Sequence, residues 1–417
     1  MWLLYQLGVA CALALAGPWL LVRRGSHYLP TLRHRLGGYP AGRPERPLWI
    51  HAVSVGEVGV AGTLAAALPA DLPLLVTTIT PTGQQRARAQ LSHRAQTAYL
   101  PFDLTPPIAR FFSRFRPAAL VLVEGDYWPL LLRRCRRQGV PVAVVNGRVG
   151  DRSFRRLARL PAALRRPLLA PIAAFGVQTA EDARRLGALG VAPERVRVTG
   201  NLKYEAPEPP RQPQLEVALA AAAAGRPILV AGSTMPGEEE AVLSAFATLG
   251  GGERALLLLA PRHPERWEAV AATLDASGLP WARRSVLEGG AGTSVVLLDS
   301  LGELAALYRL AAATFIGGTL ARSGGHNPLE PARFGRPIAV GPSMENFRDM
   351  AEQFDRAGAW QRVADAGELA AVWRRWLDDP PAAAAVGAAA LQLVESNRGA
   401  LASTRELLVP LVAAATR

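Results

Sequence analysis

The sequence predicts an α/β protein with two doubly wound parallel-sheet domains and an N-terminal membrane-anchor helix. Short apolar runs alternate with longer arginine- and alanine-rich stretches, which is the pattern of parallel strands joined by crossover helices. The pattern stops in a proline-rich segment at 205–214 and then restarts. The chain also begins with an apolar stretch about as long as a membrane helix.

The apolar stretch covers residues 3–22 and is interrupted by Gln6 and Pro18. Arg23 and Arg24 follow it directly, and such arginines tend to stay on the cytoplasmic side of a membrane. We therefore expect an anchor over 1–24 with the rest of the chain in the cytoplasm. A cleaved signal peptide is the alternative, although the start of the chain carries no basic side chain.

The first domain is expected over 25–205 and the second over 206–417, with the proline-rich segment between them. In open parallel sheets, ligands bind beyond the carboxyl ends of the strands, so the polar residues that directly follow a strand are the candidates for the site. The expected strands are PLWIHAV, LPLLVTTI, ALVLVEG and VPVAVVNG in the first domain, and RPILVAGS, RALLLLAPRH, SVVLLD, ATFIGGT and RPIAVGP in the second.

Composition narrows the function classes. The formal net charge of +13 favours anionic partners, such as nucleic acid, acidic lipid or a phosphorylated substrate. Lys203 is the one lysine in the chain and follows a leucine, so no Walker A loop exists, and GxGxxG, HExxH and GxSxG are also absent. The two cysteines, Cys11 and Cys135, imply no disulfide framework and fit a reducing compartment. The six histidines lack metal-ligand spacing, so we expect no structural metal.

Several strand ends of the first domain carry candidate groups. Glu57 opens a helix after the first strand, either as a general base or as a first-turn carboxylate that stabilises the helix dipole. The hydroxyls of residues 77–83 cap a helix or bind a substrate. Glu124 and Asp126 follow another strand beside Trp128, whose ring suits a sugar; a tight turn with a packed tryptophan is the alternative.

An arginine-rich surface is expected further along this domain. Eleven arginines and one acid, Asp151, lie between Arg133 and Arg166. Such a surface suits anionic lipid headgroups, with an ordinary solvated face as the alternative. Nucleic acid is disfavoured because base-stacking aromatic residues are nearly absent there.

The second domain carries an expected anion pocket. Residues 232–238 read as a strand, a turn and a helix start whose amides suit an anion. Arg262 and His263 follow the next strand and add positive charge. Glycines over 317–325 let backbone amides approach a phosphate, and Glu330 in the next helical turn suits a ribose diol.

Together these motifs resemble the bacterial 3-deoxy-D-manno-octulosonic acid (Kdo) transferases of lipopolysaccharide synthesis, which have the two-domain GT-B fold. The resemblance covers nearly the whole chain. It implies a CMP-Kdo donor bound by the C-terminal domain, with no cofactor, and a lipid A precursor bound by the N-terminal domain. It also implies that Glu57 deprotonates the acceptor hydroxyl in an inverting transfer. The matching motifs are HAVSVGE, TTITPTG, YLPFD, WP, NGR, GNLK, GST, PRHPER, GEL, GGHNPLEP and GPSMENF.

The resemblance assigns Glu57 as the catalytic residue, with no metal and no nucleic-acid partner. It places the protein at the cytoplasmic face of the inner membrane, held by an N-terminal signal-anchor. Acceptor binding or catalytic support is expected from Ser54, Gly56, Thr80, Gly83, Glu124 and Arg148. Donor binding is expected from Lys203, Ser233, Thr234, Arg262, His263, Gly317, Gly318, Gly325, His326, Asn327 and Glu330.

The chain departs from the family's usual pattern near the expected acceptor site. Gly125 and Asp126 stand where Thr and Glu are more frequent, and Leu130 stands in place of a frequent Asn. Thr319 replaces a commoner Ser and keeps the hydroxyl. The alternatives are another GT-B enzyme that uses a UDP-sugar on a lipid-linked acceptor, and a tethered, inactive nucleotide-binding protein.

Overall fold

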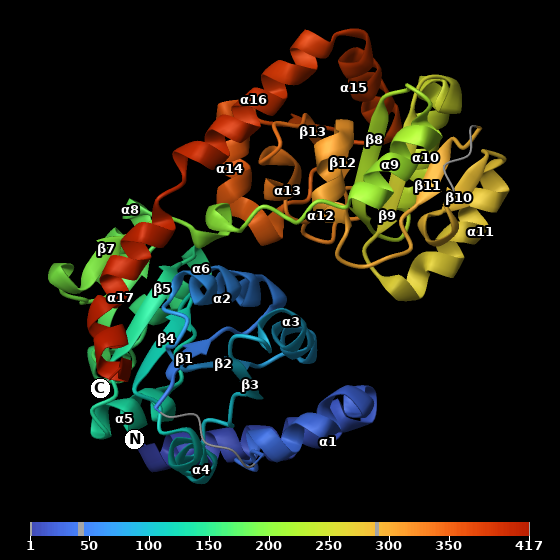
Figure 1. Cartoon of the computed structure of the whole chain (residues 1–417). Coiled ribbons are helices and arrows are strands. Elements are labelled where there is room, and N and C mark those ends of the chain that lie inside the picture. The colour runs from blue at the N-terminus through green and yellow to red at the C-terminus, as the bar shows by residue number, and fades with distance from the viewer. Residues whose placement is uncertain (1, 41–45, 288–291, 417) are drawn as a thin grey trace. The chain divides into compact units, whose positions relative to one another are not determined.

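The computed structural model describes residues 2–40, 46–287 and 292–416 (Figure 1). The chain divides into two compact units, one made of residues 1–207 with 397–417 and the other of residues 208–396. Each unit contains one seven-stranded sheet, and the strands within each sheet pair in parallel. The two parallel-sheet domains expected from the sequence are therefore confirmed.

The sheet of the first unit is buried on both faces. Its strands are β1 (Leu48–His51), β2 (Leu74–Thr78), β3 (Gln96–Tyr99), β4 (Ala119–Val123), β5 (Val142–Gly147), β6 (Ile172–Val177) and β7 (Val196–Val198). They lie in the order β3-β2-β1-β4-β5-β6-β7. Ile50 of β1 pairs with Val76 of β2 and with Val121 of β4. Ile50 and Trp49 are buried on opposite faces, as the two-residue period of a strand requires.

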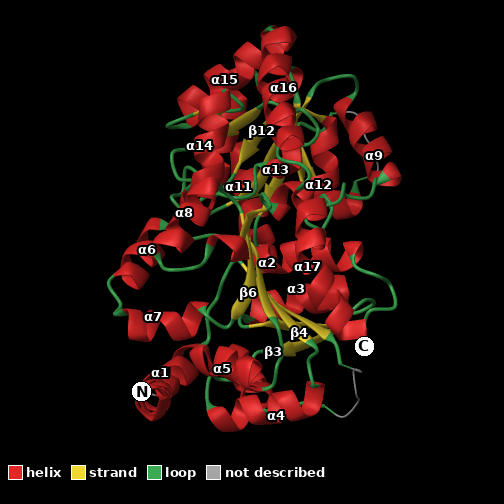
Figure 2. Ribbon diagram, turned by 90° about the vertical axis from the view of Figure 1, so that its left-hand side faces the viewer, coloured by secondary structure: helices red, strands yellow, loops and turns green. Residues whose placement is uncertain are grey.

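Helices cover both faces of this sheet (Figure 2). They are α1 (Trp2–Arg35), α2 (Val55–Ala67), α3 (Pro81–Leu91), α4 (Thr105–Phe115), α5 (Pro129–Arg137), α6 (Asp151–Ala158), α7 (Ala162–Leu169), α8 (Ala180–Ala188) and α17 (Ala400–Thr416). Side chains of α2, α3 and α17 pack on one face, and those of α4, α5 and α8 pack on the other. The direction of the connections reverses between β1 and β4, which places the switch point of the sheet there.

The second unit repeats this plan. Its strands are β8 (Ile228–Thr234), β9 (Leu256–Pro261), β10 (Trp281–Arg283), β11 (Val295–Leu297), β12 (Ala311–Ile316), β13 (Ile338–Val340) and β14 (Gln361–Arg362). They lie in the order β10-β11-β9-β8-β12-β13-β14, so the switch point falls between β8 and β12.

The helices of the second unit flank this sheet. They are α9 (Pro213–Ala223), α10 (Glu238–Leu249), α11 (Trp267–Ser277), α12 (Leu304–Leu307), α13 (Leu329–Ala332), α14 (Arg348–Ala357), α15 (Ala366–Asp378) and α16 (Pro380–Ser396). Apolar side chains of α10, α11 and α15 share one buried core with the strands, and Phe246, Phe315 and Trp373 are fully buried in it.

The last helix belongs to the first unit, whereas the sequence assigns all of 206–417 to the second domain. Leu408 and Leu411 of α17 are buried in the core of the first unit. Glu205 accepts a hydrogen bond from the amide of Gly399 at 2.5 Å. The chain therefore leaves the first unit at Pro207 and returns to it at Asn397.

The N-terminal helix packs against the first unit through its first turns. The Tyr5 hydroxyl donates to Asp103 at 2.8 Å, and the same carboxylate accepts from the amides of Leu130 and Leu131 at the start of α5. Within the three described ranges, no helix is both long and apolar enough to cross a membrane. The membrane anchor expected over 1–24 is thus not confirmed.

Candidate active site

The candidate base stands at the switch point of the first sheet. Glu57 lies in the first turn of α2, directly after β1. Its Oε2 accepts from the amide of Val53 at 2.8 Å, and its Oε1 accepts from the Ser54 hydroxyl at 3.0 Å. Ser54 is the N-cap of α2 but makes no side-chain cap bond to the helix. Its hydroxyl orients the carboxylate instead.

The surroundings of Glu57 favour its protonated form. The pKa of this carboxyl is raised to about 7, mainly by burial and also by the nearby carboxylates of Glu124 and Asp126, against the opposing effect of the Val53 amide. The side chain is only half-buried, and Gly56 beside it is exposed. Glu57 therefore combines access for a ligand with a pKa suited to proton transfer near neutral pH.

The β2–α3 turn supports the loop that carries Glu57. Thr80 is the N-cap of α3, and its hydroxyl accepts from the amide of Gly83 at 3.0 Å. The same hydroxyl donates to the Val53 carbonyl at 3.2 Å. A Cβ at Gly83 would lie 2.7 Å from the Thr80 hydroxyl and 3.2 Å from the Val53 carbonyl oxygen, so glycine allows this close approach. Both residues thus hold the Glu57 loop in place.

The end of β4 brings Glu124 and Lys203 together. Glu124 has a left-handed backbone (φ 62°), and its carboxylate forms a 2.7 Å ion pair with Lys203. Asn146, fully buried at the end of β5, donates to Glu124 at 3.3 Å. The side-chain oxygen of Asn146 accepts from the backbone amide of Leu202 at 2.8 Å. Lys203 therefore lies in the first unit beside an expected acceptor residue, and its part in donor binding stays a prediction.

Asn146 is a site residue that the strand-end reasoning did not single out. It belongs to the NGR motif and has a left-handed backbone (φ 53°). Such a backbone outside glycine is a signal of a constrained position, but it becomes visible only in the structure.

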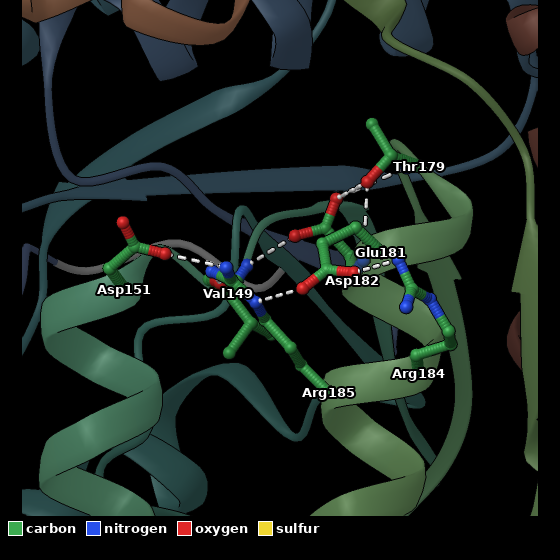
Figure 3. Close-up of polar contacts among 7 residues, drawn as sticks. All are labelled: Val149, Asp151, Thr179, Glu181, Asp182, Arg184 and Arg185. Carbon is green, nitrogen blue, oxygen red and sulfur yellow. Dashed lines mark hydrogen bonds and ion pairs between the residues drawn. The ribbon is translucent and has the colours of Figure 1, made fainter.

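The loop that carries Arg148 is fixed by α8 (Figure 3). Asp182 accepts from the Val149 amide at 2.7 Å and from the Thr179 hydroxyl at 2.6 Å. Arg185 donates to the Val149 carbonyl at 2.6 Å and pairs with Asp151 at 2.5 Å. The Arg148 side chain is exposed next to this anchored segment, which places it at the same edge of the sheet as Glu124.

In the second unit, the end of β8 carries two of the expected donor residues. Ser233 is half-buried and has a left-handed backbone (φ 59°). Thr234 is fully buried, and its hydroxyl donates to Glu239 at 2.8 Å. Arg262, at the end of β9, is exposed, and its amide donates to the Thr234 carbonyl at 3.0 Å. Half-buried His263 follows it.

The glycine turn after β12 already binds an anion from the protein itself. Glu238, the first residue of α10, is 1% exposed. Its Oε1 accepts from the amides of Thr319, Leu320 and Ala321 at 2.9, 2.8 and 3.1 Å, and its Oε2 accepts from those of Gly318 and Met235 at 2.6 and 2.9 Å. The interpretation that the amides of this turn are open to a phosphate is therefore wrong for Gly318–Ala321.

The remaining expected donor residues follow this turn. The His326 ring packs on Gly318, where an added Cβ would lie 2.9 Å from the ring. Burial, and then the charge of Arg262, lower the pKa of His326 to about 4. Asn327 donates to Glu330 at 3.5 Å and accepts from the amide of Leu329. Glu330 is half-buried in α13.

The GPSMENF segment, which the sequence analysis quotes but assigns no role, supports the same turn. Ser343 accepts from the amide of Gly324, and Asn346 donates from its side chain to the carbonyls of Ser323 and Gly325. A Cβ at Gly325 would lie 2.4 Å from the Met344 sulfur. These contacts leave no room for larger residues.

The structure thus gathers the expected residues into two sets. In the first unit it brings together Ser54, Gly56, Glu57, Thr80, Gly83, Glu124 and Lys203, with Arg148 on the neighbouring loop. In the second unit it brings together Ser233, Thr234, Gly317, Gly318, Gly325 and His326, with Arg262 and His263 just after β9, Asn327 just before α13 and Glu330 within α13. Among the described residues, no three His, Cys, Asp or Glu side chains are grouped so as to hold a metal ion.

Two parallel-sheet units with polar residues at both switch points place this chain in the GT-B class of folds. It is similar to UDP-GlcNAc 2-epimerase from Neisseria meningitidis (TM-score 0.57, 12% identity, 87% of this chain and 100% of that chain). It is also similar to a glycosyltransferase from Rickettsia africae (TM-score 0.54, 11% identity, 88% and 98%). At these identities the likeness concerns the fold alone.

Sequence comparison gives the family. Residues 30–206 match the family model for 3-deoxy-D-manno-octulosonic-acid transferase (kdotransferase). The chain is 37% identical to the 3-deoxy-D-manno-octulosonic acid transferase of Bordetella pertussis over 91% of either chain. It is 33% identical to that of Haemophilus influenzae over 94% of this chain and 93% of the relative. The chain therefore belongs to the Kdo transferase family and is a glycosyltransferase.

Proposed function

We propose that this chain transfers Kdo from CMP-Kdo to a lipid A precursor, with inversion, in the synthesis of the lipopolysaccharide inner core. Family membership supports the sugar that is transferred. The observation that carries the chemistry is Glu57: an accessible carboxylate at a sheet switch point, with a pKa raised to about 7. A carboxyl with such a pKa accepts a proton readily near neutral pH.

In the proposed reaction, Glu57 takes the proton of the acceptor's primary hydroxyl while that oxygen attacks the anomeric carbon of Kdo. The bond between this carbon and the CMP phosphate oxygen breaks, and CMP leaves with the electron pair. The Ser54 hydroxyl and the Val53 amide hold the carboxylate in one orientation, which limits the entropy lost on reaching the transition state.

The second unit supplies the proposed donor site. Negative charge grows on the phosphate as CMP departs, so fixed positive charge there stabilises the transition state. Exposed Arg262 is the strongest candidate, with His263 beside it. Glu330 accepts hydrogen bonds from the ribose hydroxyls, and Asn327 holds its carboxylate.

The acceptor and the membrane belong to the first unit in this proposal. Helix α6 has no buried residue, and Arg152, Arg155 and Arg156 on it are exposed. Such a surface attracts anionic headgroups and lipid phosphates. We place the protein at the cytoplasmic face of the inner membrane, with α1 as its N-terminal anchor.

A transfer assay tests the function. Full-length protein is incubated with freshly generated CMP-Kdo and a lipid A precursor, and the product is measured by mass. We expect Kdo transfer that CMP inhibits more strongly than UDP. Stronger inhibition by UDP, with product only from a UDP-sugar, would replace this proposal by the alternative GT-B activity. Nucleotide binding without any product would favour an inactive binding protein.

A further inference from the structure

The carboxylate of Glu238 binds a loop of the second unit. The side chain is 1% exposed and accepts five backbone hydrogen bonds, four of them from consecutive residues of the β12–α13 loop. A buried carboxylate requires such compensation because its transfer out of water is costly. The N-terminus of α10, where Glu238 is the first residue, adds a favourable dipole.

The contacts of Glu238 extend to the proposed donor residues through Gly318. The amide of Gly318 is bound by Glu238 at 2.6 Å, and its carbonyl accepts from the amides of Ser323 and Gly325 at 3.1 and 2.9 Å. The His326 ring lies against the same glycine, where an added Cβ would be 2.9 Å away. The amide and the carbonyl of Gly318 are therefore both held by hydrogen bonds. Asn327 is the residue after His326, so it continues from this fixed turn.

From these contacts we propose that Glu238 is a positioning residue for the donor site: it is a resident anion that holds the 318–325 turn in the conformation that presents His326, Asn327 and Glu330. This inference rests on the proposed function. One consequence is that the phosphate of the donor does not bind the amides of Gly318–Ala321. It relies instead on groups such as Arg262.

The neighbouring glutamates provide matched controls. Glu239 is equally buried at 1% exposure, but it binds Thr234 and Arg266 instead of the turn. Glu240 is exposed on the same helical turn. Loss of Glu239 therefore reports the loss of a buried carboxylate that does not hold the turn, and loss of Glu240 reports the change of charge.

The test is chemical rescue of Glu238→Ala. Removing the side chain leaves a small cavity lined by N–H donors, which suits formate. We expect the KM for CMP-Kdo to rise about tenfold, as for the loss of hydrogen bonds to a charged group, with kcat within about threefold of the native value. Sodium formate should lower that KM and raise the melting temperature of Glu238→Ala by roughly 2–4 °C. Sodium chloride at equal ionic strength should do neither.

Glu240→Ala should match the native protein, and Glu239→Gln should lose stability without a response to formate. If Glu238→Ala does not fold, Glu238→Gln keeps the volume and still raises the donor KM, since its amide nitrogen cannot accept from the turn. An unchanged KM in a folded Glu238 variant would overturn the proposal, as would a loss that formate does not restore in Glu238→Ala.

The two proposals fail in different ways. If the native protein transfers no Kdo, the proposed function fails. The role of Glu238 is then measured through the CMP dissociation constant and the formate-dependent melting temperature, neither of which requires turnover. If the native protein is active and Glu238→Ala binds donor normally, only the positioning role fails.

Discussion

The two units place a glutamate at the same point of the same plan, and the two carboxylates have opposite surroundings. Glu57 and Glu238 each lie in the first turn of the helix after the central strand at the switch point, β1 or β8. Glu57 is half-buried and accepts from one amide and one hydroxyl. Glu238 is buried and accepts from five amides.

The difference shows how surroundings set the role of a carboxylate. Glu57 has few donors, and burial, together with the like charges of Glu124 and Asp126, raises its pKa, so it is suited to receive a proton. The lone pairs of Glu238 are all engaged by the backbone, so it is suited to hold a loop. One helix start is therefore equipped for reaction and the other for structure.

The glycines at the two switch points show the same contrast. A Cβ at Gly56 would meet no atom within 4 Å. A Cβ at Gly232 would lie 1.9 Å from the hydroxyl of Tyr308, and one at Gly317 would lie 2.3 Å from the Ser233 carbonyl oxygen. Gly56, in the first turn of α2, is therefore open, whereas Gly232 and Gly317 are packed.

The largest expected effect is on the transfer rate and tests the role of Glu57 as the base. Glu57→Gln should lower kcat by about 10³-fold, as for the loss of a general base, because glutamine cannot take the acceptor proton. The donor KM should stay close to native, since the change is nearly isosteric, and at neutral pH the melting temperature should be no lower than native, because glutamine carries no charge to bury. Steady-state kinetics and thermal unfolding measure this, with Glu240→Ala as control. Transfer at a near-native rate by Glu57→Gln would remove Glu57 as the base.

A smaller effect is expected on stability and tests how tightly the glycines of the second unit are packed. Gly232→Ala should lower the free energy of unfolding by about 1–3 kcal/mol, the usual cost of overpacking, because Tyr308 is 1% exposed and has little room to move. Gly56→Ala should change it by less than about 0.5 kcal/mol. Urea unfolding of both variants is the measurement. Equal stability of the two would show that the second switch point is no more tightly packed than the first.

The smallest effect concerns pH. The ionised form of Glu57 is the base, so kcat should fall by about tenfold per pH unit below the pKa of this group, which burial raises to about 7. Glu124→Gln removes a like charge near Glu57, so the pH below which kcat falls, the acid limb of the pH–rate profile, should move to lower pH. The pH–rate profiles of the two proteins measure the shift. A limb that stays in place, or moves to higher pH, would contradict the coupling between these carboxylates.

The raised pKa of Glu57 also fixes the sign of its effect on stability. The folded protein binds this proton more tightly than the unfolded chain, whose pKa is near the ordinary value of 4.5. The free energy of unfolding of the native protein should therefore fall relative to that of Glu57→Gln as pH rises from 4.5 to 7.

The strands that the sequence predicts are those buried on both faces. β1, β2, β4 and β5 read as continuous apolar runs because helices cover both sides of the sheet. The edge strand β3 has the sequence QTAY and only one buried residue, so it gives no such run. β14 has two residues and no fully buried side chain.

The candidate site divides in the same way. The sequence points to Glu57, Glu124 and Arg262 because each lies at the end of an expected strand or in the turn after it. It does not single out Asn146 or Glu238, since their roles depend on partners elsewhere: Leu202 lies 56 residues from Asn146, and Gly318 lies 80 residues from Glu238. The run of three glutamates at the start of α10 is the one local signal in the sequence that points to Glu238.

By itself, the sequence determined the two sheets, the linker and the strand-end motifs, because hydrophobic period and turn residues act over short stretches of chain. The tertiary structure alone decided that α17 returns to the first unit, that Lys203 pairs with Glu124, and that Glu238 occupies the glycine turn. These are contacts between segments that are distant in the sequence. A charge or an apolar helix face that becomes buried needs a partner, and which partner is within reach depends on how the sheets are folded.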